Sequence, residues 1–394
     1  MYFFVMIILI ILIAIPDIFF YRHLKNKNVK PIYLILHLVP AVFFAGLFIY
    51  MKYIMPHMHN YRVVVVIMWF VYLFLLIYIP KLIHIIFYYL HLLYQKIYKR
   101  KSPYFDIIRI TLSVVLIIVM IFGAYVTPRQ FEVTHTTVEI ENLPPAFDGY
   151  KIVQLSDIHL GSWNNKYKRF QPVVNLVNQQ NADIIVFTGD MVNNFAQEAD
   201  GWSPVFQQLK SKNGKYAILG NHDYGDYTEW RDAKKRAENR KDIRNYIREM
   251  GFYLLLNENA VLHNGNDSVY LRGIENWGKA KNAQYGDLSK AMAGTERGVT
   301  KILLSHDPTQ WDMQVAGKED IALTLSGHTH AAQLGFTLFG KLYSPASLVF
   351  KYWSGLYQVD NNFLYVNRGL GFIGIPMMIG TRPEISVIML KRKK

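Results

Sequence analysis

Five short clusters of polar residues recur in the second half of the sequence. They read DIH at 157–159, GD at 189–190, GNHD at 220–223, SH at 305–306 and GHTH at 327–330. Together they supply imidazole, carboxylate and amide groups, a mixture that suits zinc, iron or manganese better than calcium or magnesium alone. Two such ions about 3.5–4 Å apart need a ligand that bridges them, which a carboxylate oxygen can do. The clusters therefore predict a pair of metal ions.

One such cluster by itself would be weak evidence. Alternate residues of a strand face the same side, so an isolated Asp-x-His or His-x-His pattern has an ordinary explanation. Five clusters in succession, each at the end of an apolar run, indicate a shared site. The neutral amide of Asn221 would complete a metal's shell without lowering the charge of the site, which preserves its ability to ionise water. His135 and His263 lie outside the clusters, and we interpret them as surface or strand residues.

The apolar runs in front of the clusters have the length of buried strands. Strands that alternate with helices imply an α/β sheet, and ligands of such sheets bind beyond the carboxyl ends of the strands. Every cluster lies at such an end. The predicted strands lie within 150–157, 182–190, 215–223, 301–307 and 321–330, and helical patterns occupy 165–180, 203–211 and 227–250.

The clusters and their order resemble those of the calcineurin-like metallophosphoesterases, over roughly residues 148–394. The resemblance implies a four-layer α/β/β/α sandwich and a role for each polar residue. His222 would face the phosphate and protonate the leaving oxygen or stabilise its charge, oriented by Asp223. The first metal would be held by Asp157, His159 and His330, the second by Asn221, His306 and His328, with Asp190 bridging the two.

The C-terminal stretch 365–390 resembles the closing strands of a membrane-associated bacterial group. That group includes cell-envelope phosphodiesterases and UDP-2,3-diacylglucosamine hydrolases. Its members usually have two glycines between GHTH and the next glutamine, whereas here Ala331 and Ala332 precede Gln333. We expect the two methyl groups to tighten this turn and narrow the substrate entrance without touching a ligand.

The first part of the chain has a different composition. Residues 1–127 contain two acids and twelve Lys or Arg, so most of the formal charge of +14 lies between apolar runs. This placement favours membrane loops over a nucleic-acid surface, so we expect no nucleic-acid partner. The absence of cysteine excludes disulfides, thiolate metal sites and cysteine nucleophiles.

About four transmembrane helices are predicted, at 1–21, 31–51, 63–80 and 110–128, because crossing ~30 Å of hydrocarbon takes about 20 apolar residues. We expect a membrane region at 1–128 and a metallophosphoesterase domain at 129–394. A cleaved signal peptide is the alternative for the first stretch, but no positive segment precedes it and three further spans follow. The apolar piece 82–95 is too short to span, and we expect it to extend the third helix or to lie at the interface.

The loops predict the orientation. The first loop carries Arg22, Lys25, Lys27 and Lys30 and the third carries Lys96, Lys99, Arg100 and Lys101, so both are expected in the cytoplasm. Four spans then place the domain outside the cytoplasm, on a multi-pass protein of the cell (inner) membrane. Counting 82–95 as a separate span would invert this arrangement.

Four other features allow more than one interpretation. Asp17 lies inside a predicted span, and we expect it to pair with Arg22 at the interface. The basic segment 231–248 is read as a solvated helix face, with a lipid-phosphate contact as the alternative. The aromatic segment 335–357 is either a hairpin that closes the core or an apolar lid that meets lipid. GLGFIG at 369–374 fits a turn beside the metal site better than a dinucleotide loop, because Pro376 opposes the helix that such a loop requires.

The combined features predict a membrane-anchored phosphoesterase with two divalent ions (Mn, Fe or Zn, with Mn expected in vitro). A hydroxide held between the metals would attack a phosphodiester or pyrophosphate, and the bilayer favours a lipid-linked or cell-envelope substrate. Two alternatives are a cytoplasm-facing UDP-2,3-diacylglucosamine-type pyrophosphatase and a membrane scaffold that binds metal without turnover. The oligomeric state has no signal in the sequence.

Overall fold

A computed structural model describes residues 2–54, 60–230, 232–279, 284–294 and 298–393. The chain divides into two compact units. One contains Met1–Met58 and Val66–Gly123, and the other contains His59–Val65 and Ala124–Lys394. The first unit is helical, and the second carries both large β-sheets.

The N-terminal region forms four long helices: α1 (Tyr2–Asn26), α2 (Pro31–Ile54), α3 (Tyr61–Tyr98) and α4 (Tyr104–Tyr125). Among the residues whose side chains are described, three stretches are long and apolar enough to cross a membrane: Pro31–Met51, Tyr61–Tyr98 and Tyr104–Arg129. The span predicted at 1–21 falls partly on residues outside that description, although its helix is formed. The expectation of about four apolar helices is therefore confirmed as an approximate count.

Helix α3 runs without a break through Pro80 and includes the ambiguous piece 82–95. Its 38 residues would measure about 57 Å at 1.5 Å per residue, well beyond the hydrocarbon thickness. The prediction that 82–95 extends the third helix is confirmed. The chain does not turn back within this stretch, so 82–95 does not form a separate helix.

Asp17 does not have the partner expected from the sequence. Its side chain is buried between three helices, 3% exposed. It accepts hydrogen bonds from Tyr78 Oη at 2.7 Å and Lys81 Nζ at 2.6 Å, and His37 Nε2 lies 3.1 Å away. Arg22, which is closer in sequence, is exposed instead. Asp17 therefore joins α1 to α2 and α3. A buried carboxylate is costly unless it is paired with hydrogen-bond donors or a positive charge, and here those groups lie on the other two helices.

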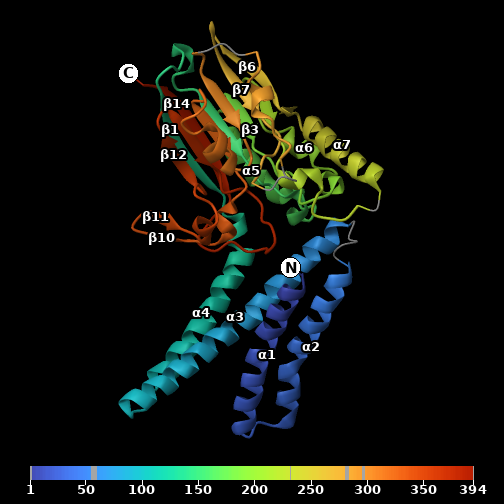
Figure 1. The fold of residues 1–394 in the computed structure, drawn as a ribbon, viewed down its shortest axis with the longest axis vertical. Coiled ribbons are helices and arrows are strands. Elements are labelled where there is room, and N and C mark those ends of the chain that lie inside the picture. Colours follow the sequence, from blue (N-terminus) through green and yellow to red (C-terminus); the bar gives the residue numbers. More distant parts are fainter. Residues whose placement is uncertain (1, 55–59, 231, 280–283, 295–297, 394) are drawn as a thin grey trace. The chain divides into compact units, whose positions relative to one another are not determined.

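The second unit is built on two six-stranded sheets (Figure 1). The first has the order β1 (Glu132–Ile140), β14 (Glu384–Arg392), β2 (Lys151–Leu155), β3 (Ile184–Phe187), β4 (Lys215–Ala217), β5 (Tyr253–Leu254). The second has the order β12 (Gly355–Val359), β13 (Asn362–Val366), β9 (Leu323–Ser326), β8 (Lys301–Leu304), β7 (Asp267–Gly273), β6 (Glu258–Asn264). The five strands predicted before the polar clusters are all present.

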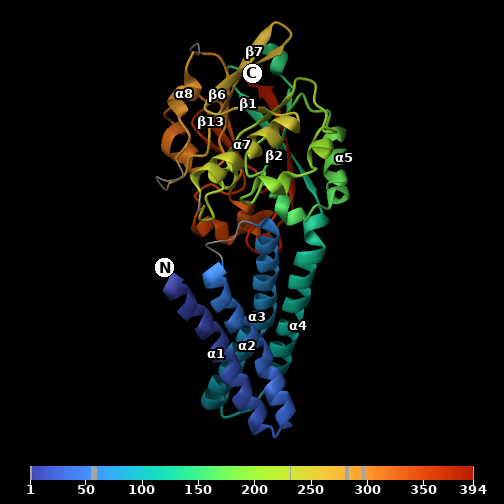
Figure 2. The same cartoon turned by 90° about the vertical axis from the view of Figure 1, so that its right-hand side faces the viewer.

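Alternating side chains of these strands build three apolar layers, as the two-residue period of a strand requires. In β3, Ile184 and Val186 face the core between the sheets, whereas Ile185 and Phe187 face α5 (Gln171–Gln179), α6 (Ser203–Phe206) and α7 (Ala233–Glu249). Figure 2 shows α5 and α7 on this outer face. A third cluster packs α8 (Leu288–Met292) and the turn Trp311–Val315 on the second sheet. The predicted α/β/β/α sandwich is confirmed.

The helices are shorter than the sequence patterns suggest. Helix α5 begins only at Gln171, with proline in its first turn, and α6 is a single turn. Helix α7 begins after Asp232, whose side chain accepts a hydrogen bond from Lys234 N. It buries Ile243 and Ile247. Its basic residues Arg236, Arg240 and Arg244 form ion pairs with Asp226 and Glu275, as expected of a solvated face; Arg231 lies outside the described residues.

The aromatic segment 335–357 does not close the core. Its strands β10 (Phe336–Leu338) and β11 (Lys341–Tyr343) form a separate two-stranded hairpin (Figure 1). All three residues of β10 are exposed. The interpretation as a core hairpin is wrong for this part. Only the end of the segment, from Gly355, joins the second sheet as β12.

The Asp17 contacts predict a large and specific effect on the helical unit. Asp17→Asn would leave the Lys81 ammonium without its counter-charge, and breaking a buried pair costs about 3 kcal/mol. We expect a clear fall in the unfolding midpoint of the purified protein in detergent. Arg22→Gln is the matched control and should behave as wild type. Equal effects of the two substitutions would instead support the Asp17–Arg22 pairing.

Candidate metal centre

The metal-binding candidates lie directly after the carboxyl ends of strands from both sheets. Asp157 and His159 follow β2, Asp190 follows β3, Asn221 lies after β4, and the remaining histidines follow β8 and β9. Five of them have a left-handed backbone: Asp157 (φ 51°), His159 (φ 49°), Asp190 (φ 62°), His328 (φ 72°) and His330 (φ 49°). Such conformations cost roughly 1–3 kcal/mol each and gather at functional sites. Here they turn the chain sharply so that the side chains converge.

Two glycines of the polar clusters are required by this close approach. A Cβ at Gly220 would overlap with Asp190 Oδ1, and one at Gly327 would overlap with Ser156 Oγ and Asp157 Oδ2. These Cβ atoms would lie well inside van der Waals distance of the neighbouring oxygens. The glycines of GNHD and GHTH therefore let two neighbouring turns meet at the carboxylates.

The first group of donors consists of Asp157, His159 and His330, all buried. The Nε2 atoms of the two histidines are 3.1 Å apart, and His330 Nε2 lies 3.3 Å from Asp157 Oδ1. The backbone N–H of His328 donates to both oxygens of Asp157 and so fixes this carboxylate. Three donor atoms thus face one point.

The second group consists of Asp190, His306 and His328, with Asn221 beside them. His306 Nε2 is the centre of this group. It lies 3.1 Å from Asp190 Oδ2, 3.0 Å from Asn221 Oδ1 and 3.2 Å from His328 Nδ1. All four residues predicted for the second metal, the bridge included, are brought together.

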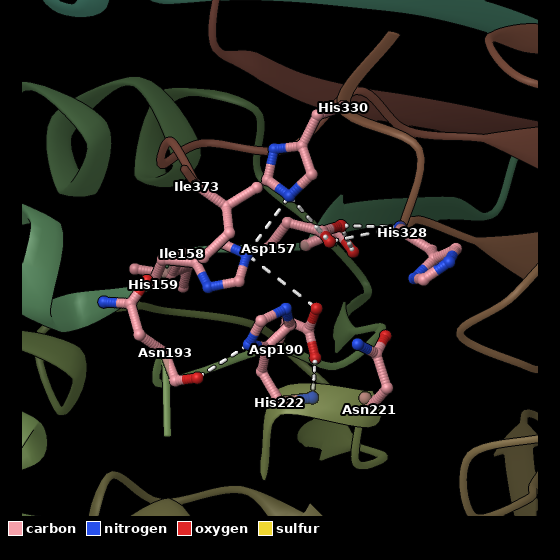
Figure 3. Close-up of polar contacts among 12 residues, drawn as sticks. Asp157, Ile158, His159, Asp190, Asn193, Asn221, His222, His328, His330 and Ile373 are labelled. Atoms are coloured by element: carbon pink, nitrogen blue, oxygen red, sulfur yellow. Dashed lines mark hydrogen bonds and ion pairs between the residues drawn. The ribbon is translucent and has the colours of Figure 1, made fainter. Parts of the chain in front are cut away.

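Asp190 connects the two groups. Its Oδ2 atom lies 3.1 Å from His306 Nε2 in the second group and 3.8 Å from His159 Nε2 in the first. Figure 3 shows Asp190 between the first group and Asn221. Two ligand atoms at about 2.1 Å from one ion lie about 3.0–3.4 Å apart, which is the spacing found within each group. The residues present therefore fit two metal ions that share Asp190.

Neighbouring groups orient the donor atoms. The Nδ1–H of His306 donates to the Thr188 carbonyl at 2.7 Å, so Nε2 is the ring nitrogen that would bind a metal ion. The amide nitrogen of Asn221 donates to Tyr227 Oη at 2.6 Å, so its oxygen faces His306. His328 Nε2 lies 3.8 Å from Asp307 Oδ2. The carboxylate favours a proton on Nε2, so Nδ1 is the atom of His328 that would bind a metal ion.

The protonation states of His306, Asp190 and His159 favour the binding of positively charged metal ions. Burial would lower the pKa of His306, but the Asp190 carboxylate outweighs it and raises the pKa to about 10. Burial also opposes ionisation of Asp190, yet His306 and His222 hold its pKa well below the usual range. Burial lowers the pKa of His159 to about 3, which keeps that imidazole neutral and able to bind a metal. The pKa shifts of His306 and Asp190 both indicate that a positive charge is favourable beside the Asp190 carboxylate.

The side chains of His222 and Asp223 contact different groups, although the sequence predicts that Asp223 orients His222. The Nδ1 atom of His222 contacts the Asn193 carbonyl at 2.6 Å, and its ring stacks on Tyr227 with centroids 4.2 Å apart. Asp223 instead accepts hydrogen bonds from four backbone N–H groups, those of Asp190, Met191, Val192 and Gly220. The expectation that Asp223 orients His222 is wrong.

Asp223 holds the backbone of Asp190 in place. Its two oxygens tie the turn at 190–192 to Gly220, so the backbone of Asp190 is fixed from two sides. Burial and the nearby Asp190 carboxylate raise the pKa of Asp223 to about 7. Cations beside Asp190 would offset this repulsion and favour the charged form of Asp223.

Three residues of the site carry no signal in the sequence patterns considered above. Tyr227 contacts both Asn221 and His222 but lies within a stretch whose pattern is helical. Asn193 holds His222 through its backbone carbonyl, which no side-chain pattern reports. Glu198 is fully buried and accepts hydrogen bonds from the N–H groups of Gly161, Asn193, Asn194 and Phe195.

Two sequence details are resolved at the rim of the site. The GLGFIG stretch is a turn beside the metal centre, because Leu370 N and Gly371 N donate to the carbonyls of Ser156 and Asp157. Ala331 and Ala332 are both left-handed, with φ of 47° and 51°, a conformation in which glycine is less strained. Ala331 is buried, whereas the methyl group of Ala332 is exposed.

The calcineurin-like phosphoesterase family model matches residues 150–332, which include every polar cluster of the centre. The uncharacterized metallophosphoesterase YkuE of Bacillus subtilis is 30% identical over 280 residues, covering 68% of this chain and 89% of that protein. This chain belongs to the calcineurin-like metallophosphoesterase family. The family is metal-dependent, in agreement with the two donor groups.

Vertebrate members of the metallophosphoesterase family are also similar. The transmembrane protein with metallophosphoesterase domain of Danio rerio is 31% identical over 290 residues, covering 71% of this chain and 62% of that protein. Its Bos taurus counterpart is 32% identical over 311 residues, covering 74% and 64%. This chain thus spans less than two thirds of either vertebrate protein. Their names associate a metallophosphoesterase domain with a transmembrane region, and the described part of this chain has three helices long and apolar enough to cross a membrane.

The contacts of His222 and Asp223 predict different results for their variants. Asp223→Asn replaces an acceptor of four N–H bonds with a group that donates, which should cost about 2 kcal/mol in unfolding free energy and misplace Asp190. Elemental analysis should then find clearly fewer than the wild-type number of metal ions per chain. His222→Ala should retain the wild-type metal content. If Asp223→Asn keeps its metal and stability and matches His222→Ala in activity, Asp223 acts through His222 after all.

Proposed function

We propose that this chain is a membrane-anchored phosphoesterase that uses two divalent metal ions to hydrolyse a phosphodiester or pyrophosphate. Family membership and the apolar helices support this proposal. The observation that carries it is the shared carboxylate of Asp190, which lies within 3.1 Å of His306 Nε2 and 3.8 Å of His159 Nε2. A site that joins two donor groups through one oxygen suits in-line displacement at phosphorus.

The predicted ligand assignment is part of the proposal. Asp157, His159 and His330 would hold one ion, Asn221, His306 and His328 the other, and Asp190 both. Bound ions would supply Lewis acidity toward the phosphate oxygens and lower the pKa of a nucleophilic water. Manganese, iron and zinc all suit this donor set. The carboxylates of Asp157 and Asp190 would offset part of the positive charge of the ions. Because Asn221 is neutral, the site would keep a net positive charge that attracts phosphate.

His222 would act on the leaving group. Because its Nδ1–H donates to the Asn193 carbonyl, Nε2 is the atom left to contact substrate. Stacking on Tyr227 and the edge contact with His159 hold the ring in one orientation. A positioned imidazole can donate a proton to a leaving oxygen and typically contributes 10²–10⁴-fold to the rate.

The substrate is proposed to be a lipid or a lipid-linked component of the cell envelope. The apolar helices α2, α3 and α4 support attachment to a membrane, where such substrates are concentrated. The basic first and third loops support a cell-membrane location with the domain, from residue 129, outside the cytoplasm. The UDP-2,3-diacylglucosamine-type reaction needs the opposite orientation, so orientation decides between these two substrate classes.

Activity provides the first test. Purified full-length protein with manganese should hydrolyse bis-p-nitrophenyl phosphate. Asp190→Asn should abolish this activity together with metal binding, and His222→Ala should lower kcat by about 10²-fold or more at unchanged metal content. Full metal occupancy without turnover across a phosphoester panel would favour the non-catalytic scaffold. Unchanged activity in both variants would exclude the proposed mechanism.

Cysteine labelling tests the orientation, since the chain has no native cysteine. Asn266→Cys lies in the exposed turn between β6 and β7, and Lys101→Cys lies in the third loop. In spheroplasts, a membrane-impermeant maleimide should label the first variant and should label the second only after lysis. The reverse pattern would place the domain in the cytoplasm and support the nucleotide-lipid substrate.

A further inference from the structure

Large apolar side chains are exposed on the β10–β11 hairpin, which belongs to neither six-stranded sheet, and on the turn Pro345–Leu348 and Val349 that follow it. We use the term apolar rim for six of these residues: Phe336, Leu338, Phe339, Tyr343, Leu348 and Val349. Phe339 is 96% exposed, Leu348 87% and Val349 69%. Exposed apolar residues elsewhere in the described part of the domain, such as Tyr253, Val261 and Met313, are scattered along the chain. A contiguous apolar cluster of this kind marks an interaction surface.

The tip of the hairpin is strained in a way that exposes an aromatic ring. Phe339 and Gly340 connect β10 to β11 with φ of 50° and 75°. Asparagine or aspartate is the usual first residue of such a turn, because a bulky side chain at positive φ is an outlier. The hairpin has only two strands, which alone are marginally stable. Neither folding of the hairpin nor the core between the sheets explains Phe339.

The apolar rim is connected to the loop that carries His328 and His330. Ser344 Oγ donates to the Ala331 carbonyl at 2.6 Å, and Thr329 Oγ1 donates to the Trp353 carbonyl at 2.6 Å. The ring of Phe350 packs edge-on against His328 with centroids 5.5 Å apart. The segment that follows the hairpin is therefore part of the wall of the metal centre.

Strand pairing places the base of the hairpin at the end of the domain where β1 begins. Gly335 N donates to the Ile379 carbonyl, and four residues later the Pro383 carbonyl accepts from Glu132 N. Glu132 starts β1 and is seven residues beyond Tyr125, the last residue of α4. Seven residues span at most about 25 Å. The chain thus enters this end of the domain from a candidate membrane span.

A lipid bilayer is the partner that these observations fit. The side chains combine aliphatic residues, which suit the acyl region, with Tyr343, which suits the interface. The exposed Lys341 lies beside them, with its ammonium 5.7 Å from the ring of Tyr343, and matches the negative charge of lipid phosphates. A short connection joins β1 to α4, which lies in a candidate membrane span.

We infer that the apolar rim inserts into the interfacial layer of the bilayer and brings the metal centre to the lipid headgroups. Phe339 and Leu348 enter the acyl boundary, and Lys341 remains at the phosphates. The substrates reached in this way are phosphoesters of membrane lipids. This inference rests on the proposed membrane anchoring, while its test requires no turnover.

Depth-dependent fluorescence quenching tests the insertion. Thr337→Cys, an exposed position in β10, leaves the apolar rim intact and is labelled with the environment-sensitive dye NBD. The full chain is reconstituted in vesicles of phosphatidylcholine and phosphatidylglycerol that contain doxyl-labelled lipid. We expect a blue-shifted emission with quenching several-fold stronger than at Asn266→Cys, which lies in the β6–β7 turn at the other end of the second sheet.

Second-site variants separate insertion from other contacts. Phe339→Asp in the Thr337→Cys protein should abolish the excess quenching, whereas the matched Phe339→Leu should retain it. Metal content should be unchanged in both, which verifies folding. Emission and quenching equal to those at position 266 would overturn the inference. A blue shift without doxyl quenching would also overturn it, since the rim would then be covered by protein, such as a second copy of the chain. Loss of phosphoesterase activity alone leaves the inference unaffected.

Discussion

The whole centre depends on keeping the carboxylate of Asp190 buried, charged and shared. Removing a carboxylate from water is costly unless opposite charges and hydrogen-bond donors replace the solvent. The backbone N–H of His222 donates to Oδ1, while Oδ2 faces His306 and His159. Asp223 fixes the Asp190 backbone, and Gly220 provides the space that a Cβ would occupy. All these neighbours therefore serve the same purpose. They hold one buried carboxylate where it could be shared by two metal ions.

The residues that converge at the proposed metal centre can be predicted from the sequence because each of them follows an apolar strand. Ligands of α/β sheets bind beyond the carboxyl ends of the strands, so the pattern predicts one shared site, and the family resemblance assigns Asp157 and His330 to it. The groups that surround these ligands are not accessible in this way. Asp223 and His222 are adjacent in sequence, yet backbone groups from another loop decide their partners. Contacts to carbonyl and N–H groups leave no trace in residue types.

The same limit applies to the features outside the site. Proximity in the chain suggests Arg22 as the partner of Asp17, whereas the actual partners are on other helices, 61 and 64 residues away for Tyr78 and Lys81. The aromatic content of 335–357 suggests burial, but the hairpin leaves Phe339 exposed. Composition predicts that a residue needs a partner of a certain kind. Packing decides whether that partner is the core, another helix or a surface.

The position of the last strand has a consequence for how the protein is made. Strand β14 lies between β1 and β2, parallel to the former and antiparallel to the latter, and described pairings connect β1 to the rest of the sheet only through it. During synthesis, the strand joined to α4 therefore waits without a neighbour until residues 384–392 have left the ribosome. Closure of the first sheet is thus a late event that follows synthesis of all four N-terminal helices. A chain interrupted near its end would leave β1 detached, and the helices would tether an incomplete domain.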